Sequence, residues 1–274
     1  MIAGRTNKSI SPPSRPSDPI GVFDSGVGGL SVLRELEKLL PHERFIFFAD
    51  QAFVPYGEKT PAELIDRTSR ITRFLLHQRC KAVVVGCNTA TCYAIGQLRQ
   101  RFSIPFIGVV PAVKPACEQT RSGVVGVIST PATARSRALR DLVRRFAGAI
   151  RVIRIGCPGL EEVVEGGGTT GPVLDAILKT RLAPIRAAGA DIIVLGCTHY
   201  PFLRSRIAKI AGARTLDSGK AVARQTRIII ESRNMLRASG LGTATFYTTN
   251  DPVRFARVAS KLLRRRVVAR AARV

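Results

Sequence analysis

The chain has 274 residues, of which 45% are hydrophobic, so it can bury a sizeable core and is not globally disordered. It carries 43 Lys and Arg against 19 Asp and Glu, a net charge of +24 that suggests acidic partners or an unusually basic proteome. No apolar run approaches the roughly 20 residues of a membrane span, and residues 1–20 lack the apolar stretch of a secretory signal. We therefore expect a cytoplasmic protein whose six cysteines are reduced thiols.

The polar, proline-containing residues 1–18 predict a disordered basic arm. From residue 20 onward, short apolar runs alternate with helical stretches, which is the pattern of parallel sheets covered by helices. The predicted strands are residues 20–23, 44–49, 82–85, 106–109, 124–128, 151–155, 191–195 and 245–247. The clearest helical stretches are residues 30–39, 61–78 and 133–146.

Two segments, residues 83–89 (VVVGCNT) and 193–199 (IVLGCTH), look like copies of each other. Each is an apolar strand followed by Gly, Cys and polar residues that start a predicted helix. Their wide separation indicates two related α/β domains that contribute one cysteine each. Because ligands of such sheets bind outside the carboxyl ends of the strands, we expect both thiols to point into a shared crevice.

Cys87 and Cys197 are therefore the predicted catalytic residues. The positive end of a helix dipole lowers a thiol pKa from about 8.5 toward neutrality. The alternative for any single cysteine is a small buried hydrophobe. We assign the cysteines that lack the duplicated setting to packing, namely Cys80, Cys92, Cys117 and Cys157.

These thiols could also bind zinc or form a catalytic pair with a histidine. Cys87 and Cys92 have a tolerable zinc-ligand spacing, but no second ligand pair follows and the chain has only three histidines, so no metal is expected. A catalytic pair of Cys197 and His199 is the other alternative. Side chains two residues apart near a helix start point in different directions, which argues against direct activation of this thiol.

Two loops after predicted strands carry further candidates. Residues 24–29 (DSGVGG) can hold an anion on backbone amides, and Asp24 can bind an ammonium group or steer a thiol. Ser31 stands where a dinucleotide fingerprint needs Gly, so a plain tight turn is the remaining alternative. Residues 50–57 predict either a stiff loop that presents the phenol of Tyr56 and backbone amides or a surface turn.

The motifs FDSGVGG (23–29), PYGEK (55–59), VGCNTA (85–90) and LGCTHYP (195–201) together resemble those of the glutamate racemases in the cofactor-independent aspartate/glutamate racemase superfamily. The resemblance covers about residues 20–250. It implies two similar flavodoxin-like α/β domains with mostly parallel sheets and an active site in the crevice between them. The first domain would comprise residues 19–111 plus 223–274, and the second residues 112–222.

The resemblance also implies roles for single residues. Cys87 would deprotonate D-glutamate and Cys197 L-glutamate, without a cofactor, to supply D-glutamate for peptidoglycan. Asp24 and His199 match auxiliary acid/base positions, and Glu165 is the candidate for a third. The implied substrate contacts are Asp24, Ser25, Tyr56, Gly57, Asn88, Thr89, Thr130, Thr198 and His199. Gln51 departs from the family pattern, which has a small hydroxyl residue there.

The chemistry fits two thiols, because racemisation removes an α-proton from one face of a carbon and returns one to the other. Aspartate and hydantoin racemases of the same superfamily are the nearest rivals. Residues 133–154 hold seven Arg and one Asp, and residues 251–274 hold seven more Arg. A solvated helix face is the simpler explanation of this charge, and a surface for nucleic acid or an acidic protein is the other. Some glutamate racemases bind DNA gyrase, so DNA gyrase is a candidate acidic-surface partner. The sequence is also compatible with a homodimer.

Overall fold

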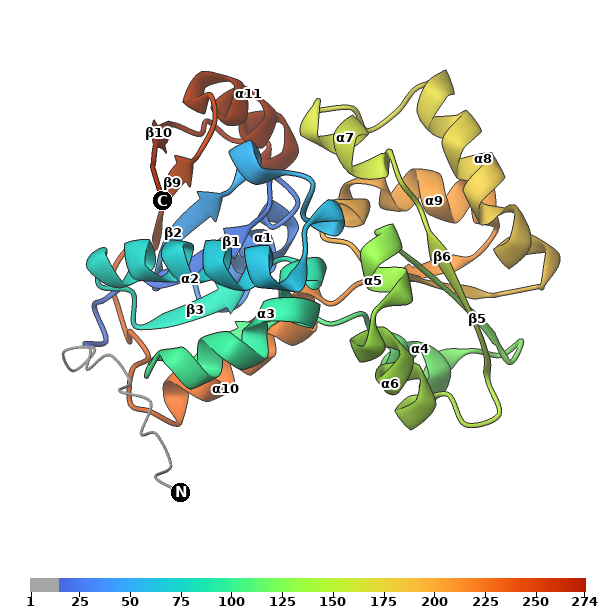
Figure 1. The fold of residues 1–274 in the computed structure, drawn as a ribbon, viewed down its shortest axis with the longest axis horizontal. Coiled ribbons are helices and arrows are strands. Elements are labelled where there is room, and N and C mark those ends of the chain that lie inside the picture. Colours follow the sequence, from blue (N-terminus) through green and yellow to red (C-terminus); the bar gives the residue numbers. More distant parts are fainter. Residues whose placement is uncertain (1–14) are drawn as a thin grey trace.

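The computed structural model describes residues 15–274, which form two α/β halves (Figure 1). Most of the predicted disordered arm, residues 1–14, lies outside the described residues. In its last part, residues 15–18, the amide of Asp18 donates to the carbonyl of Arg15 at 3.0 Å. The Asp18 carboxylate in turn accepts from the amide of Arg15 at 2.7 Å, which closes a turn.

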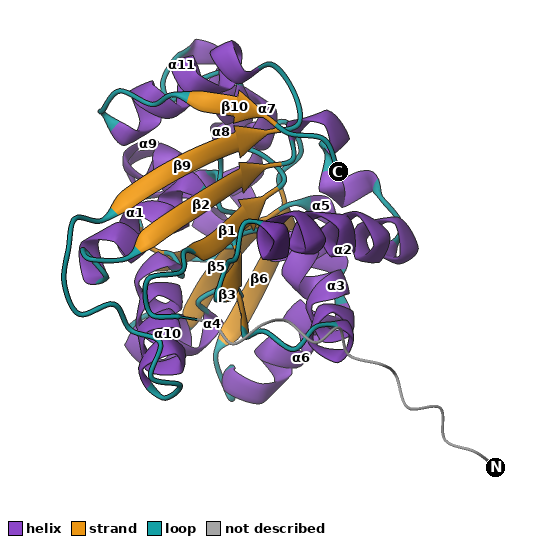
Figure 2. Ribbon diagram, turned by 90° about the vertical axis from the view of Figure 1, so that its left-hand side faces the viewer, coloured by secondary structure: helices purple, strands orange, loops and turns teal. Residues whose placement is uncertain are grey.

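The first sheet has six parallel strands in the order β10-β9-β2-β1-β3-β4 (Figure 2). The central strands are almost entirely buried, as expected for strands covered by helices on both faces. The strands are β1 (Ile20–Asp24), β2 (Arg44–Ala49), β3 (Ala82–Val85), β4 (Phe106–Gly108), β9 (Thr243–Thr248) and β10 (Ala269–Ala271).

Amphipathic helices cover this sheet. Helix α1 buries Leu30, Leu33 and Leu36, which share one face. Helix α2 begins with a capping box between Thr60 and Glu63. The covering helices are α1 (Leu30–Leu39), α2 (Pro61–His77), α3 (Asn88–Arg101), α10 (Gly219–Glu231) and α11 (Pro252–Leu263). Because α10 packs against α1, the chain returns to the first sheet after completing the second.

The second sheet has four parallel strands in the order β6-β5-β7-β8. They are β5 (Val124–Ser129), β6 (Arg151–Gly156), β7 (Ile192–Leu195) and β8 (Arg214–Leu216). The helices of this half are α4 (Val113–Gln119), α5 (Pro131–Arg135), α6 (Arg137–Phe146), α7 (Leu160–Glu165), α8 (Pro172–Ala187) and α9 (Arg204–Ala211). Among residues 15–274, no helix is long and apolar enough to cross a membrane.

The predicted α/β class with two mostly parallel sheets is confirmed, and each predicted strand lies within two residues of its observed ends. Strands β8 and β10 were not predicted; both are edge strands of three residues, one of which is an arginine. The single helix predicted over residues 133–146 is wrong. It is broken at Ser136, whose hydroxyl accepts from the amide of Leu139 at 3.1 Å and caps α6.

Two chain crossings join the halves, after β4 and after β8. They contact each other, because the hydroxyl of Ser218 donates to the carbonyl of Val110 at 2.5 Å. The first sheet is built from segments within residues 19–111 and 223–274 and the second from segments within 112–222. Helix α10 spans residue 223, and the domain limits themselves stay a prediction.

Candidate active site

A cavity of about 30 Å³ lies between the two halves, at the carboxyl ends of their strands. Cys87 follows β3 and Cys197 follows β7, and both thiols line this cavity at 6% and 5% exposure. Every predicted site residue lines it except Asp24 and Glu165. The lining residues are Ser25, Val54, Pro55, Tyr56, Gly57, Cys87, Asn88, Thr89, Thr130, Glu161, Cys197, Thr198 and His199.

The thiol of Cys197 has a histidine partner. Its Sγ lies 3.5 Å from Nδ1 of His199, whose Nε2 lies 2.7 Å from Oε1 of Glu165. The expectation that these side chains point apart is wrong. His199 adopts a helical backbone conformation in the turn that precedes a short 3-10 helix, Tyr200–Leu203, so its ring folds back onto the thiol.

Glu165 crosses from the second half to the glycine-rich loop of the first. It accepts from the amide of Val27 at 2.7 Å and from Nε2 of Gln51 at 2.5 Å. A Cβ at Gly26 would lie 1.8 Å from the Glu165 carboxylate, and one at Gly28 would lie 2.5 Å from the His199 ring. The loop is therefore more than a tight turn, because its glycines leave room for the carboxylate and the imidazole.

Gln51, where the sequence departs from the family pattern, holds the Glu165 carboxylate in place through a hydrogen bond. Its Oε1 accepts from the hydroxyl of Thr248 at 3.0 Å, and that hydroxyl accepts from the amide of Asn250 at 3.3 Å. Since an ionised carboxylate can only accept hydrogen bonds, the glutamine amide nitrogen is turned toward Glu165 and its oxygen toward Thr248. The sequence predicted no role for Gln51.

Cys87 has a different environment. It caps the N-terminus of α3, and its thiol donates to the hydroxyl of Ser25 at 3.9 Å. The Asp24 carboxylate accepts from the amide of Ser25 at 2.6 Å and from the hydroxyl of Thr198 at 2.9 Å. Asp24 therefore lies just behind the cavity wall and ties the loop of the first half to the second.

Burial raises the pKa of both thiols, which contradicts the predicted lowering by a helix terminus. For Cys87 the pKa is well above its ordinary value, and the charge of Asp24 raises it further. For Cys197 the hydrogen bond and charge of His199 oppose the effect of burial. No α-helix begins directly after Cys197, since the short 3-10 helix intervenes, so the helix-terminus argument applies to Cys87 alone.

The auxiliary groups are poised for proton transfer. Burial raises the pKa of Asp24 to about 6. Burial opposes a charge on His199, but its hydrogen bonds to Cys197 and Glu165 outweigh burial and raise its pKa well above the ordinary value. Burial likewise disfavours ionised Glu165, yet hydrogen bonds from His199, Gln51 and Val27 lower its pKa. His199 is therefore suited to hold a proton between the Glu165 carboxylate and the Cys197 sulfur.

Polar side chains complete the cavity wall. The hydroxyl of Thr89 lies 3.2 Å from those of Thr130 and Thr133. Asn88 is 4% exposed, and its Oδ1 has no hydrogen-bond partner among residues 15–274. Because a buried acceptor without a partner is costly, this oxygen is suited to a ligand donor such as an ammonium group.

The loop of residues 50–57 is not a surface turn, because Tyr56 is buried and its hydroxyl donates to Asp50 at 2.7 Å. Arg67 donates to both oxygens of Asp50, with bonds of 2.6 and 2.8 Å. Arg67 was not predicted as a site residue, since nothing in the sequence links this residue of α2 to the loop. Glu161, which lines the cavity four residues before Glu165 in the chain, was not predicted either.

Among residues 15–274, no group of three or more His, Cys, Asp and Glu side chains could hold a metal ion. Cys92, the alternative zinc ligand, accepts a hydrogen bond from the Ser136 hydroxyl at 3.6 Å. Cys80 and Cys157 are buried and Cys117 is half-buried. Burial raises the pKa of Cys80 above its usual range and that of Cys157 to about 12, as expected for thiols used in packing.

These features define an α/β enzyme in which each half contributes one thiol to a shared cavity. A family model for Asp/Glu/Hydantoin racemases matches residues 20–226. A glutamate racemase of Herpetosiphon aurantiacus is 46% identical over 243 residues, which covers 88% of this chain and 96% of that protein.

Solved structures agree with this match. A glutamate racemase isoform of Bacillus anthracis has a TM-score of 0.86 at 30% identity and covers 95% of this chain and 99% of its own. The Francisella tularensis glutamate racemase in complex with D-glutamate has a TM-score of 0.82 at 29% identity and covers 94% and 98%. The chain belongs to the Asp/Glu/hydantoin racemase family and is an amino-acid racemase.

Proposed function

We propose that this protein is a glutamate racemase that interconverts L- and D-glutamate with two thiols and no cofactor. The observation that carries the proposal is that Cys87 and Cys197, from different halves of the fold, line one buried cavity. One base cannot easily reach both faces of an α-carbon in a closed site, whereas two thiols can. Support for glutamate comes from the relatives, among them the Francisella tularensis enzyme in complex with D-glutamate.

In the L-to-D direction, Cys197 acts as the base. Its proton moves to Nδ1 of His199, 3.5 Å away, and Glu165 stabilises the imidazolium that results. The thiolate takes the α-proton of L-glutamate and becomes a thiol, while the electron pair of the broken C–H bond stays on the α-carbon. Cys87 donates its proton to the other face of that carbon and becomes a thiolate.

In the reverse direction the thiols exchange roles. Cys87 must first be a thiolate, and Asp24 is the neighbouring group that can take up a proton, because burial raises its pKa to about 6. Cys197 then supplies the proton that completes L-glutamate. Each thiol thus has an auxiliary group, His199 with Glu165 for one and Asp24 for the other.

The polar wall would bind the substrate and stabilise charge in the transition state. The unpartnered Oδ1 of Asn88 would accept a hydrogen bond from the α-ammonium group. The hydroxyl of Thr89 and the side-chain amide nitrogen of Asn88 would donate to the carboxylate, where negative charge develops as the α-proton leaves, and Thr130 and Thr198 would contact the same substrate from the wall. Ser25, Tyr56 and Gly57, which also line the cavity, would complete the substrate contacts.

In the cell, this activity would supply D-glutamate for peptidoglycan synthesis in the cytoplasm. A homodimer, and contact of the basic surface with DNA gyrase or nucleic acid, stay predictions. Neither is needed for the proton transfers proposed here.

Circular dichroism of amino-acid solutions tests the proposal without any added cofactor. Purified protein should abolish the signal of L-glutamate and of D-glutamate, since both relax to the same racemate. L-aspartate and a 5-substituted hydantoin should keep their signals over the same period. Faster loss of the aspartate or hydantoin signal would contradict the assignment of substrate, and no change with any of the three would contradict racemase activity.

A further inference from the structure

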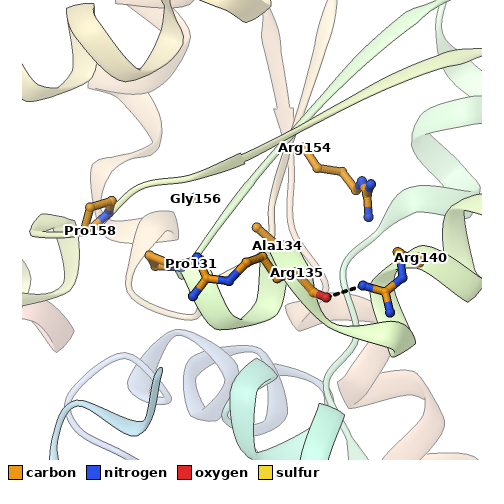
Figure 3. Close-up of a pocket in the computed structure, with 7 residues that line it drawn as sticks. All are labelled: Pro131, Ala134, Arg135, Arg140, Arg154, Gly156 and Pro158. Atoms are coloured by element: carbon orange, nitrogen blue, oxygen red, sulfur yellow. Dashed lines mark hydrogen bonds between the residues drawn. The ribbon is translucent and has the colours of Figure 1, made fainter. Parts of the chain in front are cut away.

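Arg67 is held in a way that sets it apart from the exposed arginines of this chain. Arg135, Arg140 and Arg154, which surround an open hollow beside α5 and β6, are exposed, and none of the residues that line that hollow is acidic (Figure 3). The side chain of Arg67 is 16% exposed and is ion-paired with the Asp50 carboxylate, which is 0% exposed. Since a buried ion pair contributes little net stability, the place of this pair in the fold is the feature to explain.

Each of the three nitrogen atoms of the Arg67 guanidinium group donates to a different acceptor. Nε donates to Oδ2 of Asp50 at 2.8 Å and Nη2 donates to Oδ1 at 2.6 Å, a paired geometry that suits arginine and not lysine. Nη1 donates to the main-chain carbonyl of Val274 at 2.8 Å. Arg67 therefore joins the start of the loop of residues 50–57 to residues 272–274, which follow β10.

Asp50 and Arg67 together fix the loop that forms one wall of the cavity. Oδ2 of Asp50 also accepts from the Tyr56 hydroxyl at 2.7 Å, and Oδ1 accepts from the Thr249 hydroxyl at 3.0 Å. The Arg67 guanidinium lies over the Phe53 ring, 5.2 Å from its centroid. That ring meets the Tyr56 ring edge-on at 6.0 Å. Tyr56 is thus held at its hydroxyl and at its ring.

Residues 272–274 are themselves anchored. The amide of Ala272 donates to the carbonyl of Thr248, at the end of β9, at 2.8 Å. Val274 packs against the hydrophobic cluster that contains Tyr56 and Cys87. The Val274 carbonyl is therefore a fixed acceptor that can hold the Arg67 guanidinium in one orientation.

We propose that Arg67 and residues 272–274 position Tyr56 and Gly57 for substrate binding, which makes Arg67 a positioning residue although it does not line the cavity. This inference rests on the proposed racemase function, in which Tyr56 and Gly57 contact the substrate. The Asp50 carboxylate can only accept, so the Tyr56 proton points toward it. The phenol oxygen then offers the cavity an acceptor, which suits the ammonium group of an amino acid.

Steady-state kinetics with glutamate test the role of Arg67. Arg67→Ala should raise KM about tenfold and lower kcat less than about threefold, because the loop loses its support while neither thiol loses a contact. Arg67→Lys keeps the charge but cannot reach both Asp50 oxygens and Val274, so its KM should fall between those of the wild type and Arg67→Ala.

The matched control is Arg70→Ala, three residues along the same helix, where Arg70 forms an exposed ion pair with Asp66. Its KM should change by less than about twofold. An unchanged KM in Arg67→Ala would overturn the proposal. An equal rise in KM in Arg70→Ala would also overturn it, because the effect would then be one of charge or of helix stability.

A variant that lacks residues 272–274 tests the other half of the proposal and keeps the Arg67–Asp50 pair, so it remains informative if Arg67→Ala fails to fold. Its KM should rise about threefold. Combined with Arg67→Ala, the truncation should add less than about twofold, because both changes remove the same contact. If the truncation alone has no effect, or if the two effects multiply, these residues do not act through Arg67 and the proposal is wrong.

Amide hydrogen exchange without substrate separates this inference from the proposed function. Peptides that cover residues 50–57 should exchange about tenfold faster in Arg67→Ala and in the truncated variant, while β1 and β3 keep the exchange rates of the wild type, which checks folding. Unchanged exchange in the loop would overturn the inference even in an active racemase. Faster exchange in the variants of a protein that does not racemise glutamate would support the dependence of the loop on Arg67 and contradict only the proposed function.

Discussion

The two thiols follow almost identical strand–Gly–Cys segments but lie in different environments. Cys197 contacts His199, which Glu165, Gln51 and Val27 stabilise through a chain of hydrogen bonds. Cys87 has no such chain: its thiol donates to the Ser25 hydroxyl, and the backbone of Ala90 supplies a further hydrogen bond. The repeated motif therefore fixes where the sulfur atoms lie, and the residues around them decide how each sulfur loses its proton.

Thermodynamics prevents this asymmetry from making kcat/KM differ between the two directions. The two enantiomers have equal free energy in water, so kcat/KM must be equal in the two directions for the wild type and for every variant. Damage to one thiol's environment therefore slows both directions together. The difference between the two regions should appear in the pH dependence and in the separate values of kcat and KM.

The largest expected effect comes from removing either thiol. Cys87→Ala and Cys197→Ala should each lower kcat/KM by about 10³-fold or more, because each removes a general acid/base. Racemisation followed by circular dichroism measures this effect. Cys117→Ala, which changes a half-buried thiol outside the cavity, is the matched control and should keep its activity. Normal turnover in either cavity variant would contradict the two-thiol scheme.

A smaller effect is expected from His199→Gln, which removes the proton acceptor of Cys197. We expect a loss of about 100-fold in kcat/KM. Because the pKa of Cys197 loses the lowering effect of the histidine, activity should partly recover as the pH rises from about 8 to about 10. His77→Gln changes an exposed histidine on α2 and should leave the pH profile unchanged. A parallel loss at every pH would indicate damage to the fold.

Gln51 tests the difference between the surroundings of Cys197 and Cys87, because it acts on Cys197 only through Glu165 and His199. Gln51→Ala should lower kcat about threefold to tenfold by removing one hydrogen bond to a buried carboxylate. Gln51→Glu keeps the size but places a second carboxylate beside Glu165, which raises the pKa of Glu165 and should cost more. The pH profile of kcat should shift in both variants. Equal activity in wild type and Gln51→Glu would show that the side chain only fills space.

The fourth prediction concerns Asp24 and stability. Burial raises its pKa to about 6, so the folded state binds a proton more tightly than the unfolded state and loses stability as the pH rises from about 4 to above 6. Asp24→Asn should therefore raise the free energy of unfolding at pH 7.5 by up to about 3 kcal/mol and leave it nearly unchanged below about pH 4. Denaturant unfolding of the wild type and Asp24→Asn at both pH values measures this difference in the free energy of unfolding. An equal difference in unfolding free energy at the two pH values would contradict the claim that the buried charge of Asp24 destabilises the folded state.

Much of the fold could be predicted from the sequence, because buried parallel strands are continuous apolar runs such as residues 82–85 and 192–195. Strands β8 and β10 escaped prediction because three-residue edge strands carry no such run. The two thiols were found through their duplicated setting. The return of His199 onto Cys197 depends on one turn of backbone, which residue spacing does not reveal.

Contacts across the crevice were beyond prediction for a different reason. Glu165 and Gln51 lie 114 positions apart and meet only because the two sheets face each other. The identity of Gln51 marked a departure from a pattern, and its role became visible only with Thr248 and Asn250 beside it. The pKa of the thiols was predicted with the wrong sign for the same reason, since burial depends on the closed crevice.

The most direct measurement of the central claim is the early time course of racemisation of L-glutamate in heavy water. Two thiols predict that the first D-glutamate formed carries deuterium at the α-carbon, because its new hydrogen comes from a solvent-exchanged thiol on the opposite face. The remaining L-glutamate should carry protium at that stage. D-glutamate that retains the original α-protium from the start would mean that one base serves both faces, and it would contradict the account.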